Sequence, residues 1–273
     1  MAANPQDFRG KYGPTALILG GSEGIGRQFA EQLGAAGLDL VLVARRAAPL
    51  EAAAAELRAA HGVCVTTRAA DLAATDVGAL ARSLLSTHEV GLLVCNAGAT
   101  HGVGMFVEEP LDKALALARL NCLAPLAFAH EALARMRPRG KGGMIVVSSM
   151  SGLGGSGLIA TYAAAKAFEI ALCEGLNWEL SRAGVDVLCA VAGLTDTPAM
   201  RRSGLSYAAA AAAGFTAMDA AEVARGALAH LGRGAIWYAP GAPAAAAMRA
   251  APREALTGSM TEAAAALYNV ALR

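Results

Sequence analysis

The chain has 273 residues and a net charge of +1 at neutral pH, and 55% of its residues are hydrophobic but only 5% aromatic. This length is enough for one sizeable α/β domain with a core of its own. The balanced charge gives no electrostatic argument for binding nucleic acid or an acidic membrane surface. No charge-free apolar stretch approaches 18 residues, and the first ten residues are polar, so we expect neither a membrane span nor a signal peptide.

The cysteines and histidines show no spacing typical of a disulfide framework or of a metal site. Three of the five cysteines lie in or beside apolar segments, so we expect reduced thiols, a cytoplasmic protein and no bound metal. His101 is open to two interpretations: a surface side chain in a loop, or one that faces a ligand.

Short apolar runs alternate with segments of helical periodicity along the chain. This alternation predicts an α/β fold of the Rossmann type, with a doubly wound parallel sheet of about seven strands and helices on both faces. Ligands bind beyond the carboxyl ends of the strands in such folds. We expect strands at 15–20, 38–44, 63–69, 91–95, 143–149, 185–191 and 235–239. We expect helices at 24–36, 47–60, 75–87, 111–136, 160–182 and 219–231.

The first predicted strand runs into a glycine-rich segment that is followed by a predicted helix. This order is typical of a dinucleotide site, because glycines let the backbone approach a pyrophosphate and the helix N-terminus supplies amide donors. The candidate cofactor contacts in this segment are Gly20, Ser22, Glu23, Gly24, Ile25 and Gly26.

The second predicted strand ends in two arginines, Arg45 and Arg46. An acidic residue at this place would hold the ribose 2′-hydroxyl of NAD, whereas an arginine suits the 2′-phosphate of NADP. We therefore predict NADP(H) as the cofactor. The choice over NAD stays open on two grounds: both arginines are also compatible with solvated side chains that open a helix, and the carboxylate of Glu23 would repel a second phosphate.

The fifth predicted strand ends in a serine, and a tyrosine–lysine pair lies in the helix predicted after it. Ser149 ends this strand, and Tyr162 and Lys166 lie four residues apart in the next predicted helix. Residues at this interval share one helix face, so the lysine ammonium can favour the phenolate form of the tyrosine. Such a tyrosine is a general acid/base for a ketone or an alcohol, and a serine hydroxyl can donate a hydrogen bond to the same substrate oxygen.

In this order the motifs resemble those of the short-chain dehydrogenase/reductase family, over about residues 12 to 240. The family pattern is a glycine loop, Asn-Ala-Gly after the fourth strand, a helix asparagine, a strand-end serine and Tyr-x-x-x-Lys. This chain has them at Gly20/Gly24/Gly26, Asn96-Ala97-Gly98, Asn121, Ser149 and Tyr162/Lys166.

The resemblance implies a catalytic set of Asn121, Ser149, Tyr162 and Lys166. Asn121 would kink its helix and hold a water that links Lys166 to solvent, and Lys166 would also hold the hydroxyls of the nicotinamide ribose. Ser149 and Tyr162 would contact the substrate. The further implied cofactor contacts are Asp71 and Leu72 at the adenine, Asn96, Ala97 and Gly98 along the cofactor, and Gly193, Thr195 and Thr197 at the carboxamide.

Three positions depart from the family pattern. Leu19 replaces a threonine and Cys95 an asparagine, and each change costs local hydrogen bonds. Ala192 replaces a proline, which would loosen the loop over the nicotinamide. None of these changes removes a catalytic group.

Four segments also resemble bacterial hydroxysteroid dehydrogenases, including the bile-acid 7β type: 11–14, 17–26, 147–152 and 195–198. We therefore expect an NADP(H)-dependent oxidoreductase that interconverts a hydrophobic secondary alcohol and its ketone, with a hydroxysteroid as the expected substrate. Two alternatives stay open: a 3-oxoacyl thioester reductase, and a non-catalytic NADP(H)-binding sensor or scaffold.

We expect a single dinucleotide-binding and catalytic domain over residues 1–273. Residues 196–217 predict a substrate lid with a short helix, although the alanine run 208–213 is equally compatible with a plain helix. The C-terminal extension, 241–273, predicts a terminal helix that packs on the lid or at a subunit contact. The family resemblance implies that helices 111–136 and 160–182 contact another subunit, so we expect a homodimer or homotetramer.

Overall fold

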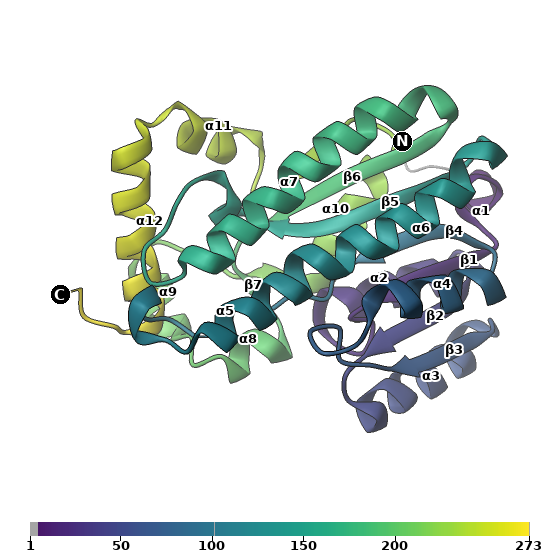
Figure 1. Ribbon diagram of the computed structural model, residues 1–273, viewed down its shortest axis with the longest axis horizontal. Helices are drawn as coiled ribbons and strands as arrows, with labels where there is room; N and C mark the ends of the chain where they lie inside the picture. Colours follow the sequence, from purple (N-terminus) through teal and green to yellow (C-terminus); the bar gives the residue numbers. More distant parts are fainter. Residues whose placement is uncertain (1–4, 101, 273) are drawn as a thin grey trace.

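The computed structural model describes residues 5–100 and 102–272, so His101 lies outside the described residues. Its centre is a parallel sheet with the strand order β3-β2-β1-β4-β5-β6-β9 (Figure 1). The strands are β1 (Thr15–Leu19), β2 (Asp39–Ala44), β3 (Val65–Ala69), β4 (Val90–Cys95), β5 (Gly142–Ser149), β6 (Val185–Ala192) and β9 (Ile236–Tyr238). The predicted Rossmann-type sheet of seven strands is confirmed.

The central strands of the sheet are buried on both faces, which explains their continuous apolar runs, whereas the edge strand β3 is largely exposed. Every residue of the central strands β1 and β4 is buried. The strand order reverses between these two strands, because β1 continues to β2 and β3 on one side while β4 leads to β5 and β6 on the other. A doubly wound sheet binds its ligand at such a switch point, beyond the carboxyl ends of the strands.

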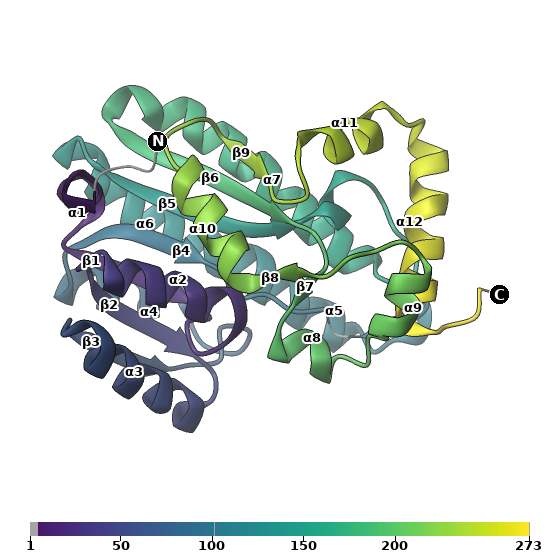
Figure 2. The ribbon, with the colours of Figure 1, turned by 180° about the vertical axis from the view of Figure 1, so that it is seen from behind.

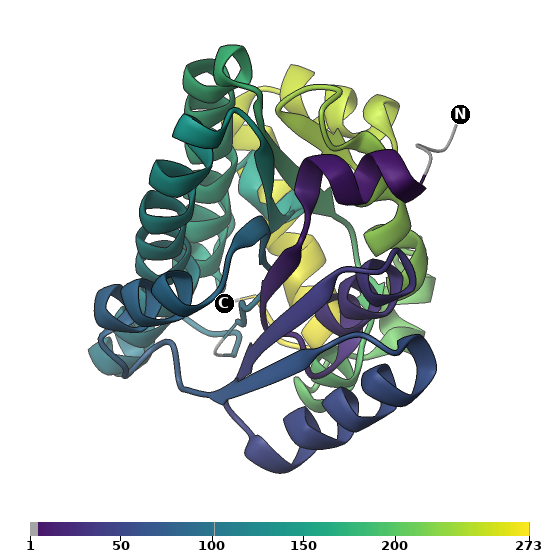
Figure 3. The same cartoon turned by 90° about the vertical axis from the view of Figure 1, so that its right-hand side faces the viewer.

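Two layers of helices cover the sheet, one on each face (Figure 3). One layer packs around Phe29 and the other around Phe128, and both side chains are fully buried. The first layer holds α2 (Gly24–Ala35), α3 (Ala47–His61) and α10 (Ala220–His230). The second layer holds α4 (Val77–Thr87), α6 (Ala124–Arg139) and α7 (Ala160–Leu180).

The predicted helix 111–136 is interrupted in the structure. It consists of α5 (Leu111–Ala118), a π-helical turn (Arg119–Leu123) and α6. Pro125 has no backbone N–H, so the carbonyl of Asn121 lacks its usual partner four residues on, and the helix widens at this point. The irregularity at Asn121 agrees with the kink that the family resemblance implied.

The helices nearest the two ends of the described chain were only partly predicted. The helix α1 (Pro5–Tyr12) was not predicted, and it precedes β1 at the edge where the strands begin. The helices α11 (Ala242–Ala250) and α12 (Arg253–Tyr268) follow β9 and lie beyond the opposite edge of the sheet (Figure 2). No helix within residues 5–100 and 102–272 is long and apolar enough to cross a bilayer.

The segment predicted as a lid contains more structure than expected. Two helices, α8 (Pro198–Arg202) and α9 (Tyr207–Ala212), lie between the strands β7 (Thr195–Asp196) and β8 (Met218–Asp219), which pair in a second small sheet. The alanine run forms most of α9. Short 3-10 turns complete the fold at Phe106–Glu108, Met150–Leu153 and Ser181–Ala183.

Candidate active site

The glycine loop between β1 and α2 forms a tight turn against the end of β4. Gly20 has a φ of +84°, and a Cβ on Gly26 would lie 2.0 Å from the carbonyl oxygen of Gly20. The Asn96 amide donates to this same oxygen at 3.2 Å. No side chain caps the first turn of α2, so its backbone amides are available to an anion. This cradle fits a pyrophosphate, as the glycine spacing predicted.

An ion-pair cluster joins the glycine loop to the end of β2 and to α8. Arg46 Nη2 lies 2.9 Å from Glu23 Oε2, and the guanidinium of Arg202 in α8 pairs with the other oxygen of the same carboxylate. Arg45 is exposed beside this cluster. Two cations therefore compensate Glu23, which weakens its expected repulsion of a 2′-phosphate.

The other predicted cofactor residues lie along the same edge. Leu72 is buried after β3, while Asp71 is exposed and its carboxylate accepts from the backbone of Ala73 at 3.0 Å. The backbone amides of Asn96 and Ala97 donate to the carbonyl of Leu19 at 3.1 and 2.7 Å, which ties the ends of β4 and β1 together.

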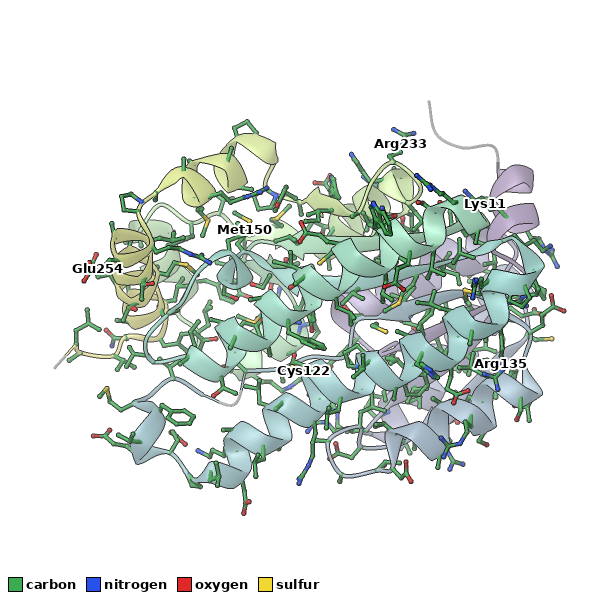
Figure 4. All side chains as sticks on the ribbon, turned by 45° about the horizontal axis from the view of Figure 1, so that its top comes forward. Lys11, Cys122, Arg135, Met150, Arg233 and Glu254 are labelled. Atoms are coloured by element: carbon green, nitrogen blue, oxygen red, sulfur yellow. The ribbon has the colours of Figure 1, made fainter. Side chains whose placement is uncertain are left out.

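The predicted catalytic serine and tyrosine lie on two elements that pack against each other. Ser149 is the last residue of β5, and its hydroxyl accepts from Ser151 Oγ at 2.9 Å. The 3-10 turn that begins at Met150 (labelled in Figure 4) then runs over α7, because a Cβ on Gly152 would lie 2.6 Å from the backbone of Lys166. Tyr162 is half-buried in the first turns of α7.

The ammonium of Lys166 lies 5.7 Å from the centre of the Tyr162 ring. It is buried, and it donates to the backbone carbonyl of Val147 at 3.0 Å and to both oxygens of Glu169 at 2.9 and 3.0 Å. Burial is the largest single influence and lowers the pKa of Lys166, but the carboxylate of Glu169 together with Tyr162 outweighs it, so the pKa of the ammonium is raised. Lys166 is therefore a cation at neutral pH.

Asn121 is fully buried in the π-helical turn, next to Cys122 (Figure 4). Its amide nitrogen donates to the carbonyls of Leu117 and Ala99 at 3.0 and 3.2 Å. Its Oδ1 has no hydrogen-bond partner within the described residues. A Cβ on Gly98 would lie 2.7 Å from this oxygen and 3.2 Å from Lys166 Nζ, so both polar groups approach Gly98. The arrangement fits the water site that the resemblance implied, which stays a prediction.

The segment after β6 closes the site on the lid side. The hydroxyl of Thr195 donates to the carbonyl of Gly193 at 3.1 Å, and Thr197 caps α8 by accepting from the amide of Met200 at 3.2 Å. A Cβ on Gly24 would lie 3.1 Å from the Thr197 methyl group. The glycine loop and the segment 193–197 therefore lie against each other at this edge of the sheet.

The C-terminal helix α12 adds a residue that the sequence did not indicate. The pKa of Tyr268 is raised above its usual value, mainly because the side chain is partly buried. The nearby Tyr162 adds to this rise, and a hydrogen bond with Ser203 opposes it. The helix also reaches the loop after β5, where Thr261 Oγ1 accepts from the amide of Gly157 at 2.7 Å. The predicted terminal helix is present; the carbonyl of Leu267 accepts from the amide of Ser206 at 2.9 Å, next to α9, and Tyr268 lies near Tyr162.

One surface cavity lies away from these residues. A surface cavity of about 260 Å³, lined by residues 85–90 with Arg135 and Arg139, lies where β4 begins, at the opposite edge of the sheet. Among the described residues, no group of three or more His, Cys, Asp or Glu side chains could hold a metal ion.

Residues 14–208 match the model of the family described as short chain dehydrogenase. The chain belongs to the short-chain dehydrogenase family. The family match covers the glycine loop, Asn96, Asn121, Ser149, Tyr162 and Lys166.

Two groups of curated relatives have similar sequences. A very-long-chain 3-oxoacyl-CoA reductase of Laccaria bicolor is 34% identical over 187 residues, which are 67% of this chain and 55% of that protein. A 7β-hydroxysteroid dehydrogenase of Collinsella aerofaciens is 31% identical over 195 residues, which are 71% of this chain and 73% of that protein. The chain thus spans about half the length of the 3-oxoacyl-CoA reductase.

Solved short-chain dehydrogenases share the whole fold. A 7β-hydroxysteroid dehydrogenase structure superposes with a TM-score of 0.84 at 27% identity, covering 93% of this chain and 98% of the other. A short-chain dehydrogenase from Sphingobium yanoikuyae in complex with NADPH superposes with a TM-score of 0.78 at 32% identity, covering 90% of this chain and 93% of the other.

Two residues beside the family motifs were missed by the sequence analysis. Glu169 has a local signal, a charged side chain three residues after Lys166 in an otherwise apolar helix segment. Tyr268 has none, because only the tertiary fold brings α12 to the site.

Proposed function

We propose that this short-chain dehydrogenase interconverts a hydrophobic secondary alcohol and its ketone with NADP(H), and that a hydroxysteroid is its substrate. The observation that carries the proposal is the Lys166 ammonium 5.7 Å from the Tyr162 ring, beside the strand-end Ser149. This pairing is what proton transfer to a carbonyl oxygen requires.

Each residue has a distinct part in the proposed reaction. A bound nicotinamide cofactor supplies or accepts the hydride. Tyr162 gives its phenolic proton to the substrate oxygen during reduction and takes it back during oxidation. Ser149 donates a hydrogen bond to the same oxygen as charge develops on it. Lys166 stabilises the phenolate, and Asn121 links this ammonium to solvent through its unpartnered Oδ1.

The hydroxysteroid substrate is supported by likeness at two levels. A relative at 31% identity and a structural neighbour with a TM-score of 0.84 are both 7β-hydroxysteroid dehydrogenases. A second neighbour, at 30% identity and a TM-score of 0.74, is an alcohol dehydrogenase from Comamonas testosteroni specific for bulky-bulky ketones. We propose that α8, α9 and α12 act as the substrate lid and enclose a bulky apolar ring system.

The second candidate is reduction of a 3-oxoacyl thioester, which the relatives at 34% and 35% identity favour. NADPH oxidation against a panel of steroid ketones, aliphatic ketones and 3-oxoacyl thioesters separates the two. We expect the highest kcat/KM with steroid ketones. A preference for thioesters would replace the first proposal, and tight NADPH binding without turnover of any compound would favour a sensor.

Arg46 gives a test of the cofactor. Arg46→Ala is expected to weaken NADPH binding by roughly 10–100-fold and NADH binding by less than about twofold, because a charge-assisted hydrogen bond to a 2′-phosphate contributes about 1.5–3 kcal/mol. Fluorescence titration with both cofactors measures this. Arg182→Ala, an exposed arginine in the turn Ser181–Ala183, is the matched control. Equal losses for NADH and NADPH would contradict the assignment.

We also propose that the protein is a homodimer or homotetramer. Large apolar side chains are exposed along α5, the π-helical turn, α6 and α7, most of all Trp178 with 77% of its surface exposed; the others are Leu111, Leu115, Leu123 and Leu126. Burying such side chains against a second copy is favourable. Light scattering is expected to give a mass at least twice that of one chain, and a monomer at micromolar concentration would contradict this. The cytoplasmic location stays a prediction.

A further inference from the structure

A buried carboxylate that belongs to none of the family motifs lies directly under the catalytic pair. Glu169 is 2% exposed and follows Lys166 by three residues in α7. Both of its oxygens accept from Lys166 Nζ, at 2.9 and 3.0 Å, so the contact is bidentate.

This contact fixes where the ammonium can be. An ammonium has three hydrogens, and the three acceptors around Nζ are the two oxygens of Glu169 and the carbonyl of Val147. Ser148 holds the same region together, because its hydroxyl donates to the backbone carbonyl of Lys166 at 2.8 Å. Lys166 is therefore held between β5 and α7. A hydrogen bond from its Nζ to a ribose hydroxyl would use a hydrogen that one of these three acceptors now holds, so that hydrogen has to be shared or released.

Glu169 is the charged partner that faces Lys166. The other titratable groups around the pair are Tyr162 on α7 and four thiols from four different elements: Cys95, Cys122, Cys173 and Cys189. Burial raises the pKa of Cys95 and Cys122, and a hydrogen bond with Cys189 together with burial raises that of Cys173. The raised pKa values of Cys95, Cys122 and Cys173 keep these three thiols protonated near pH 7, and among the described residues the carboxylate that contacts the ammonium is that of Glu169.

A purely structural explanation of the ion pair is weak on energetic grounds. Removing two charges from water costs several kcal/mol per ion, and well-packed apolar side chains usually stabilise such a site as well or better. Burial raises the pKa of the Glu169 carboxyl, and the ammonium of Lys166 opposes that rise. An ion pair with so large a desolvation cost, next to a proton-transferring tyrosine, is expected where the charge of the lysine has to be controlled.

We propose that Glu169 is a positioning residue of the hydride-transfer site, whose carboxylate holds the Lys166 ammonium at a fixed point below Tyr162 and offsets part of its charge. The inference rests on the proposed function of Tyr162 as the acid/base. Glu169 does not touch the substrate and acts only through Lys166. It thereby sets the pH range in which the tyrosine is protonated and the lysine is charged.

The sign of the effect follows from charge alone. Replacing Glu169 by Gln removes the negative charge that mainly opposes the effect of burial, so the pKa of Lys166 falls. While Lys166 is still charged, its full ammonium charge favours the phenolate of Tyr162 more strongly. In alcohol oxidation the acid limb reports the phenolate and the alkaline limb reports the ammonium. Both limbs therefore move to lower pH.

The test is the pH profile of kcat/KM for alcohol oxidation in Glu169→Gln. We expect the alkaline limb to move down by about 1–3 pH units and the acid limb to move the same way by less. Glu169→Asp keeps the charge and is expected to keep both limbs within a few tenths of a unit, although its rate falls. Glu174→Gln, on the same helix with its side chain exposed, is the matched control with an unchanged profile. A uniform loss of rate in Glu169→Gln with unmoved limbs would overturn the proposal.

A second measurement needs no substrate and separates this inference from the proposed function. The difference in ultraviolet phenolate absorbance between the protein and Tyr162→Phe reports ionisation of Tyr162, and it should move to lower pH in the Glu169→Gln background. If no ketone of the panel is reduced, the proposed function is contradicted, but this titration still tests the effect of Glu169 on Tyr162. If Glu169→Gln does not fold, Lys166→Met/Glu169→Gln is expected to recover cooperative unfolding, since the unpaired buried ammonium is gone. No recovery would refute the pairing.

Discussion

Replacing Tyr162 by Phe is expected to lower kcat for ketone reduction by roughly 10²–10⁴-fold, the usual contribution of general acid/base catalysis. The change removes only the hydroxyl. The ring, its place in α7 and its contact with the Lys166 ammonium remain. The affinity for NADPH, measured by fluorescence titration, should therefore change by no more than about twofold.

Tyr12→Phe is the matched control for this variant. Tyr12 donates to Asp186 Oδ2 at 2.5 Å near the edge where the strands begin, at the opposite end of the sheet from Ser149 and Tyr162. The control should lose about 1.5–3 kcal/mol of stability, as expected for a lost hydrogen bond to a charged group, but keep its kcat. Normal ketone turnover by Tyr162→Phe would remove Tyr162 from the reaction.

Gly26→Ala is expected to abolish measurable NADPH binding and to lower the free energy of unfolding by about 1–3 kcal/mol. The added Cβ would lie 2.0 Å from the carbonyl oxygen of Gly20 and 2.5 Å from the Asn96 amide nitrogen. The first of these atoms is backbone and cannot rotate away. The turn has to open, and the cradle for the pyrophosphate is lost with it.

Gly258→Ala is the matched control for this substitution. Gly258 is exposed in α12, and nothing lies within 4 Å of a Cβ placed on it. The control should keep NADPH affinity and gain up to about 1 kcal/mol, since alanine is the better helix residue. Unchanged NADPH affinity in Gly26→Ala would contradict the glycine loop as the dinucleotide site.

The strands could be predicted from the sequence because buried parallel strands are continuous apolar runs. All seven expected strands are present, with ends shifted by two residues at most, as at 63–69, which became Val65–Ala69. The helix 111–136 could not be predicted whole, because periodicity does not show that Pro125 would widen the turn at Asn121. The division of the lid into α8 and α9 depends on the capping side chains of Thr197 and Ser206.

Spacing along the chain indicated the candidate catalytic residues, because helical periodicity places Lys166 on the face of Tyr162. The spacing did not show that the carboxylate of Glu169 compensates the charge of Lys166. The expected repulsion from Glu23 also depended on a distant partner, since Arg202 of the lid pairs with its carboxylate. Two of the departures from the family pattern fill the core instead of making hydrogen bonds: Leu19 is 1% and Cys95 is 5% exposed.

The most direct measurement uses NADPH with deuterium at both C4 positions and follows the label into the product of ketone reduction. We predict one deuterium on the carbinol carbon of the alcohol, a hydroxyl proton that comes from solvent, and loss of the label transfer in Tyr162→Phe. An alcohol without the label, or NADPH that stays unconsumed with every ketone and thioester offered, would contradict hydride transfer by this site.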